Sequence, residues 1–313
     1  ALRAFYAHSL SLWPAANDFA HLLWIDRDER SGETRLKSAL LNNEPRAEIG
    51  PTLLADAPTR HYAAAALEDG ALQVVWSGGA GAWPALFAQT IDPRGRAGFP
   101  QRLGPGDHPA LVAASDGTLM LYWIDEGGLY GALLAGEILL NTRRLAPLPA
   151  LRAGDRVEAL YAAHDARSAY LFVQLVRSDG TPELWWTQGT PNAARWEAPA
   201  RFGFALLAGQ IETTYNSGPA QPARTDTAML ARWGAPLPGE EAVQAIAVQQ
   251  EDALYVLYLR DGALFAGQRL LEDLPALLAP PTLARDRDRH LLLSWTVPRF
   301  AQPAVLHFVS TRR

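Results

Sequence analysis

The chain has 313 residues, of which 49% are hydrophobic and 19% charged, values typical of a folded globular protein. Its net charge of −5 argues against a nucleic-acid binder, which usually has a basic face, and no apolar run reaches the ~18–20 residues of a membrane-spanning helix. The lack of cysteine excludes disulfides, thiolate catalysis and cysteine-ligated metal centres.

A seven-residue apolar frame recurs along the chain. Its copies are Asp18–Trp24, Gly70–Trp76, Gly117–Trp123, Ser168–Gln174, Asp252–Tyr258 and Arg289–Trp295. Each copy is rich in β-branched, aromatic and leucine residues and is flanked by turn residues, which predicts a buried β-strand. The copies end 37 to 52 residues apart, except for one interval of 84 residues. Such a period, with several strands in each unit, is typical of a β-propeller.

The neighbours of each frame predict three further strands per unit. A polar hairpin joins the frame to a preceding strand, as in His61–Leu67 and Pro109–Ala114. A glycine-containing turn leads to a third strand, as in Leu129–Leu134, and a more polar fourth strand follows, as in Gly98–Leu103. Asp-Gly and Gly-Gly pairs between apolar runs favour tight hairpins because type I′ turns need positive φ. Four antiparallel strands make one propeller blade.

We therefore predict an all-β fold in which residues 1–313 form a single six-bladed propeller. Seven blades are the alternative, because the 84-residue interval has room for a degenerate blade. We interpret 204–238 as an insertion of two strands, Phe204–Thr213 and Thr227–Trp233, around a loop rich in proline, glycine and alanine. The last unit shows three strands, and we expect Leu2–Tyr6 to supply the fourth and close the ring.

The segment Ser178–Phe202 resembles one hairpin of the sialidase-like propellers whose blades carry Asp-box, or neuraminidase, repeats. It has a strand, a polar turn, Trp196, and then Glu-x-Pro before an outer strand. The full box, Ser-x-Asp-x-Gly-x-Thr-Trp, is nowhere intact, and no Arg-Ile-Pro segment lies near the N-terminus. The resemblance implies the fold over nearly the whole chain. It assigns no catalytic residue.

The sequence predicts no cofactor and no metal site, because the seven histidines are scattered without ligand spacing. Propeller topology nevertheless gathers polar residues on the face that carries the inter-blade links and the loops between second and third strands. These residues are Asp26, Asp28, Arg60, His61, Asp107, His108, Asp125, Glu126, Asp179 and Asp261. Paired carboxylates there would suit a glycosidase. Aspartate is equally what hairpin tips are made of, since it favours turns by local hydrogen bonding.

The tryptophans fall into two groups. Trp24, Trp76, Trp123 and Trp295 recur at one position of the frame, which predicts packing between neighbouring blades. A second group is off that register: Trp83, Trp185, Trp186, Trp196 and Trp233. An exposed member of this second group would stack on a sugar ring or on an apolar patch of a partner.

The leading functional hypothesis is a non-catalytic recognition or scaffolding module that binds a protein or glycan partner. Its contact surfaces would be the polar face and the insertion around Tyr215 and Asn216, since departures from a repeat often carry contacts. Because the chain begins at Ala1 and lacks cysteine, we expect an exported or cell-surface protein. The alternatives are a sialidase-like glycoside hydrolase that uses Asp26 or Asp125 in a central pocket, and a subunit of a larger assembly.

Overall fold

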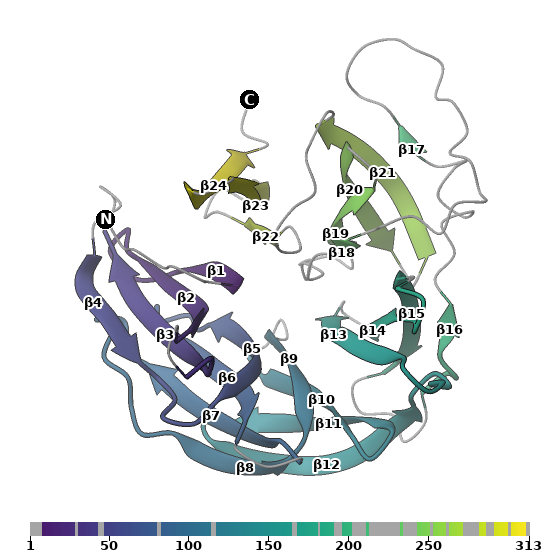
Figure 1. Cartoon of the computed structure of the whole chain (residues 1–313), viewed down its shortest axis with the longest axis horizontal. Coiled ribbons are helices and arrows are strands. Elements are labelled where there is room, and N and C mark those ends of the chain that lie inside the picture. Colours follow the sequence, from purple (N-terminus) through teal and green to yellow (C-terminus); the bar gives the residue numbers. More distant parts are fainter. Residues whose placement is uncertain are drawn as a thin grey trace. The chain divides into compact units, whose positions relative to one another are not determined.

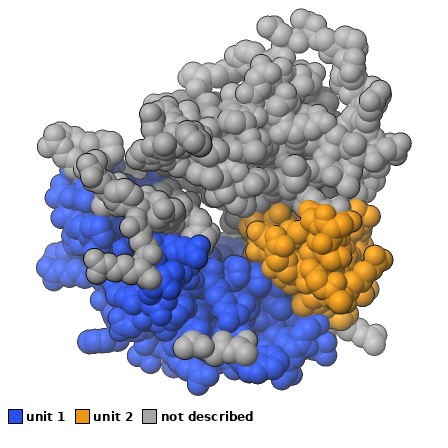
Figure 2. Space-filling view, in the orientation of Figure 1, with its two compact units in different colours: residues 1–145 blue, residues 146–313 orange. Residues whose placement is uncertain are grey.

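The computed structural model describes most of residues 8–201 and separate strands in the rest of the chain. The described ranges are 8–28, 31–42, 47–79, 83–113, 117–164, 168–180, 182–190, 196–201, 211–212, 232–233, 243–250, 253–260, 263–271, 282–285, 291–299 and 302–310, with side chains described within 11–201. The regular structure in these ranges is β, and none of them contains a helix long and apolar enough to cross a membrane. The chain divides into two compact units, residues 1–145 and 146–313 (Figure 2).

The first unit contains three antiparallel four-stranded sheets (Figure 1). The first sheet has β1 (His8–Pro14), β2 (Ala20–Arg27), β3 (Thr34–Leu41) and β4 (Ala47–Leu53). The second has β5 (Thr59–Ala66), β6 (Leu72–Gly78), β7 (Ala85–Ile91) and β8 (Gln101–Pro105). The third has β9 (Asp107–Ala113), β10 (Leu119–Asp125), β11 (Gly128–Ala135) and β12 (Ile138–Pro147). In each sheet the strands pair in chain order.

The second unit contains the remaining sheets. A four-stranded sheet has β13 (Arg156–His164), β14 (Ala169–Val176), β15 (Pro182–Gly189) and β16 (Ala200–Arg201). A five-stranded sheet has the order β17 (Ile211–Glu212), β21 (Ala263–Leu271), β20 (Ala253–Arg260), β19 (Val243–Gln250) and β18 (Arg232–Trp233). A three-stranded sheet has β22 (Thr282–Arg285), β23 (Leu291–Arg299) and β24 (Gln302–Ser310).

Each of the six apolar frames ends within the second of three consecutive antiparallel strands, which confirms the prediction of a strand there. These strands are β2, β6, β10, β14, β20 and β23. The segment 204–238 contributes β17 and β18 to opposite edges of one sheet, where β17 pairs in parallel with β21. The rest of that segment, and Leu2–Tyr6, lie outside the described residues. The number of blades and the closure of a ring therefore stay predictions.

The core of the first unit lies between neighbouring sheets. Leu23 and Ile25 of the first sheet pack with Trp76 of the second, and Leu86 of the second packs with Trp123 of the third. Trp76 and Trp123 therefore pack between neighbouring sheets, as the sequence predicts. Each has only 2–4% of its surface exposed, so its burial contributes strongly to the stability of the stacked sheets.

One hairpin illustrates how local sequence determines this framework. Asp125 pairs with Gly128, so Glu126 and Gly127 form a two-residue turn between β10 and β11. Their φ angles of 43° and 71° are those of the type I′ turn that matches the twist of a hairpin. Glycine at position 127 adopts this conformation without steric cost.

Candidate functional site

β-Bulges at the starts of β5 and β9 shape the polar end of the second and third sheets. Along β5 the register shifts between Thr59 and His61, so Arg60 is an extra residue. Along β9 it shifts between Asp107 and Ala110, around His108. Consecutive side chains of a regular strand point to opposite faces, and a bulge re-aims them. The bulge in β5 thus allows both Arg60 and His61 to face one carboxylate on the neighbouring sheet.

That carboxylate belongs to Asp107. Its Oδ1 accepts a hydrogen bond of 2.5 Å from Ser77 Oγ and one of 2.8 Å from the backbone N–H of His108. His61 Nε2 lies 3.9 Å and His108 Nδ1 3.7 Å from Oδ1, and a guanidinium nitrogen of Arg60 lies 3.8 Å from Oδ2. The two imidazole rings stack with their centroids 3.8 Å apart. We call Arg60, His61, Ser77, Asp107 and His108 the polar cluster.

The electrostatics of the polar cluster keep Asp107 ionised. Burial by itself raises the pKa of Asp107, but His108, the Ser77 hydroxyl and His61 together hold it below the ordinary value of 3.8. His108 adopts a φ of 50°, which is uncommon for a non-glycine residue. Sparsely populated backbone conformations cluster at functional sites, where the surrounding structure holds them.

The sequence predicts that Arg60, His61, Asp107 and His108 share one face. The structure brings Arg60, His61 and His108 together around Asp107. Ser77 was not singled out. It lies one residue beyond the recurring Trp76, inside an apolar strand. Its hydrogen bond to Asp107 of the next sheet is visible only in the structure.

Two other predicted residues have local structural partners. Asp26 in β2 forms an ion pair of 2.5 Å with Lys37 of β3, which is the single lysine of the chain. Asp28 accepts hydrogen bonds from the backbone N–H and the hydroxyl of Ser31, and so stabilises the turn before β3. These contacts fit the turn-forming interpretation of Asp28.

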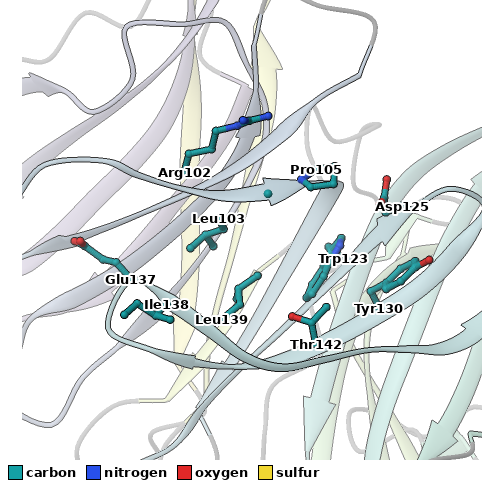
Figure 3. A pocket seen from close by; sticks show the side chains of 11 residues that line it. Arg102, Leu103, Pro105, Trp123, Asp125, Tyr130, Glu137, Ile138, Leu139 and Thr142 are labelled. Atoms are coloured by element: carbon teal, nitrogen blue, oxygen red, sulfur yellow. The ribbon is translucent and has the colours of Figure 1, made fainter.

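Asp125 lines a groove of about 480 Å³ between β8 of the second sheet and β10–β12 of the third (Figure 3). Burial, followed by the nearby charge of Glu126, raises the pKa of Asp125 above its usual range. Trp123 and Tyr130 stack beside it with centroids 5.8 Å apart. Glu137 lies toward the other end of the groove (Figure 3).

Among the off-register tryptophans whose side chains the structure describes, Trp83 is the exposed one. It has 82% of its surface exposed and lies in the connection between β6 and β7. The backbone N–H of Gly106 donates a hydrogen bond of 3.1 Å to the carbonyl of Pro84. Trp83 directly precedes Pro84, and Asp107 directly follows Gly106. The exposed indole therefore lies at the same end of the sheets as the polar cluster.

The remaining predicted residues fall elsewhere. Asp179 lies in the exposed turn between β14 and β15 of the second unit. Asp261, Tyr215 and Asn216 lie outside the described residues. In the same part of the second unit, Arg177 contacts Asp155 at 2.7 Å and Glu183 at 2.6 Å, a network that the sequence analysis did not predict.

Comparison with known proteins supports the fold alone. No known family matches the sequence, and no curated protein matches it. A protein of unknown function from Dyadobacter fermentans has a similar structure, with a TM-score of 0.64, 11% identity, and coverage of 97% of this chain and 93% of the other. The GH93 α-L-arabinofuranosidase of Fusarium graminearum, solved with arabinobiose, has a TM-score of 0.60, 9% identity, and coverage of 92% and 88%.

These likenesses, together with the four-stranded antiparallel sheets, assign the architecture. The fold is β-propeller-like. The carbohydrate-active enzymes among the similar structures do not distinguish a sialidase-like relationship from other propeller families.

Proposed function

We propose that this chain is a non-catalytic propeller module that recognises a glycan. The glycan would bind Trp83 and the polar cluster, which lie at the same end of the sheets. The observation that carries the proposal is the 82% exposure of Trp83. A tryptophan is usually buried, and an indole face held in solvent beside hydrogen-bonding groups is suited to stack on a sugar ring. The β-propeller-like fold that the chain shares with a glycan-binding arabinofuranosidase supports this ligand class.

The polar cluster supplies the directional contacts that such a ligand needs. Arg60 is 41% and His61 36% exposed, so both reach solvent beside Asp107. Guanidinium and imidazole groups are hydrogen-bond partners for sugar hydroxyls. In this proposal the propeller has six blades, Leu2–Tyr6 closes the ring, and the protein acts outside the cytoplasm.

Glycan binding is tested by titrating the purified protein with a panel of oligosaccharides that includes arabinobiose. Trp83→Ala should weaken binding about fivefold or more, because burying an aromatic face against a ligand contributes on the order of 1–3 kcal/mol. Phe99→Ala is the matched control, since Phe99 is 85% exposed but lies near the opposite end of β7, next to Gly98, whose N–H donates to the Thr90 carbonyl. Equal losses in both variants, or no binding by the parent chain, would contradict the proposal. Binding of a protein partner instead would identify the other partner class.

A glycoside hydrolase is the second candidate function, and the groove of Figure 3 favours it. The pKa of Asp125 is raised, which is the direction that a general acid needs, and Glu137 lines the same groove. The test is hydrolysis of oligosaccharides, whose sugar leaving group depends on protonation, with cleavage abolished by Asp125→Asn. A parent chain that binds oligosaccharides and leaves them intact would exclude this candidate.

A further inference from the structure

The polar cluster also has the composition of a metal site. His61, Asp107 and His108 each offer a ligand atom, and these three atoms lie within 4.8 Å of one another. The ligand atoms come from two neighbouring sheets, since His61 is in β5 while Asp107 and His108 begin β9. An ion bound among them would cross-link the sheets.

We propose that His61 Nε2, His108 Nδ1 and a carboxylate oxygen of Asp107 bind a Zn²⁺ ion. Two imidazoles and one carboxylate are a donor set that zinc favours, with the fourth position left to water or a bound ligand. Ligand atoms at about 2.0–2.2 Å from a tetrahedral ion are about 3.4 Å from one another. The separations of 3.7 and 3.9 Å from Asp107 Oδ1 are only a few tenths of an ångström longer.

The surroundings of the three ligands favour their use. The Ser77 hydroxyl and the backbone N–H of His108 both donate to Asp107 Oδ1, which fixes the carboxylate in the way that outer partners orient metal ligands. His61 is 36% exposed, which leaves a path for the ion to enter.

Arg60 is the one member of the polar cluster whose charge opposes the ion. Its guanidinium lies 3.8 Å from Asp107 Oδ2 and the side chain is 41% exposed. A long side chain at such a position moves into solvent at little cost. Arg60 therefore provides a sharp control, because its removal takes away a repulsive charge and no ligand.

The experiment is calorimetric titration of untagged, chelator-treated protein with ZnCl₂. We expect one ion per chain, and a rise in melting temperature of about 5 °C or more at saturating zinc. His61→Ala and His108→Asn should each weaken binding by at least about tenfold. Asparagine is chosen at position 108 because it tolerates positive φ. Arg60→Ala should bind zinc as tightly as the parent chain or more tightly.

Two further measurements make the result decisive. The melting temperature of each variant without metal identifies any loss of folding, and Co²⁺ absorption reports whether the bound ion is four-coordinate. The proposal is overturned if the parent chain binds no zinc, or if both histidine variants bind it with parental affinity. It stands independently of glycan binding, since zinc is titrated in the absence of any sugar.

Discussion

The Ser77 hydroxyl donates a hydrogen bond of 2.5 Å to Asp107 Oδ1 and thereby joins β6 to the start of β9. Ser77 has none of its surface exposed, so its hydroxyl has exchanged water for this single carboxylate. Hydrogen bonds to charged groups contribute more than neutral ones. One serine at the end of an apolar strand therefore helps to align two sheets and the imidazoles around Asp107.

Replacing Ser77 by alanine should lower the free energy of unfolding by about 1–3 kcal/mol, because Asp107 loses its side-chain donor. The measurement is a double-mutant cycle in urea with Ser77→Ala, Asp107→Asn and the double variant. We expect a coupling energy between about 0.5 and 3 kcal/mol. Strictly additive losses would mean that the two side chains do not interact.

Gly106 precedes Asp107 and has no tolerance for a side chain. Its φ is 147°, and a Cβ atom there would lie 2.5 Å from Cδ1 of Trp123. Gly104 has a nearly identical φ of 148° but open space around the same position. Gly106→Ala should therefore destabilise the protein by about 1–3 kcal/mol more than Gly104→Ala does, since the backbone strain is shared and only the overlap differs. Equal urea midpoints for the two variants would refute this steric argument.

Periodicity in the sequence predicted the strands, because a buried strand followed by a Gly-containing turn leaves a readable pattern. It also placed Arg60, His61 and His108 on one face, since β-propeller topology determines which loops share an end of the blades. The bulges that turn these residues toward Asp107 were not predictable, because a bulge changes the register by one residue and leaves the composition unaltered. The contact of Ser77 was likewise hidden, since it depends on how two sheets stack.

His21 in β2 should make stability depend on pH near neutrality. Only 1% of the residue is exposed, and its Nε2 lies 3.0 Å from the carbonyl oxygen of Gly70. Burial lowers the pKa of His21 below 6.5, although the Gly70 carbonyl and Asp92 partly oppose this shift. The unfolded chain then binds a proton more readily, so stability present above pH 6.5 is lost as pH falls through the folded pKa.

His21→Gln removes this titration and keeps a polar group opposite the carbonyl. The stability of the parent chain relative to His21→Gln should therefore decrease as pH falls from 8 to 5. Urea unfolding at both pH values measures the difference. A difference that is constant across this range would show that His21 keeps its ordinary pKa in the fold.

Arg177 should dominate the acid sensitivity of the first sheet in the second unit. The backbone N–H of Arg152 and the Arg177 guanidinium lower the pKa of Asp155 below 3.8. Burial raises the pKa of Glu183, but Arg177, Trp185 and Arg201 together outweigh burial, so the pKa falls below 4.5. A carboxyl group whose pKa is lowered by folding stabilises the fold at pH values above its ordinary pKa. That contribution is lost as pH falls through the lowered pKa of the folded state.

Arg177→Met should therefore lower the melting temperature markedly at pH 7, and the difference from the parent chain should shrink below pH 3.8, where both carboxyl groups gain protons. Arg156→Met is the control, because Arg156 pairs with Glu158 at 3.2 Å in a surface contact whose side chains are 64% and 47% exposed. Exposed pairs of this kind contribute little. If the two variants melt alike at pH 7, the network around Arg177 does not stabilise the sheet; if the loss at Arg177 persists unchanged at pH 3, its cause is packing and not charge.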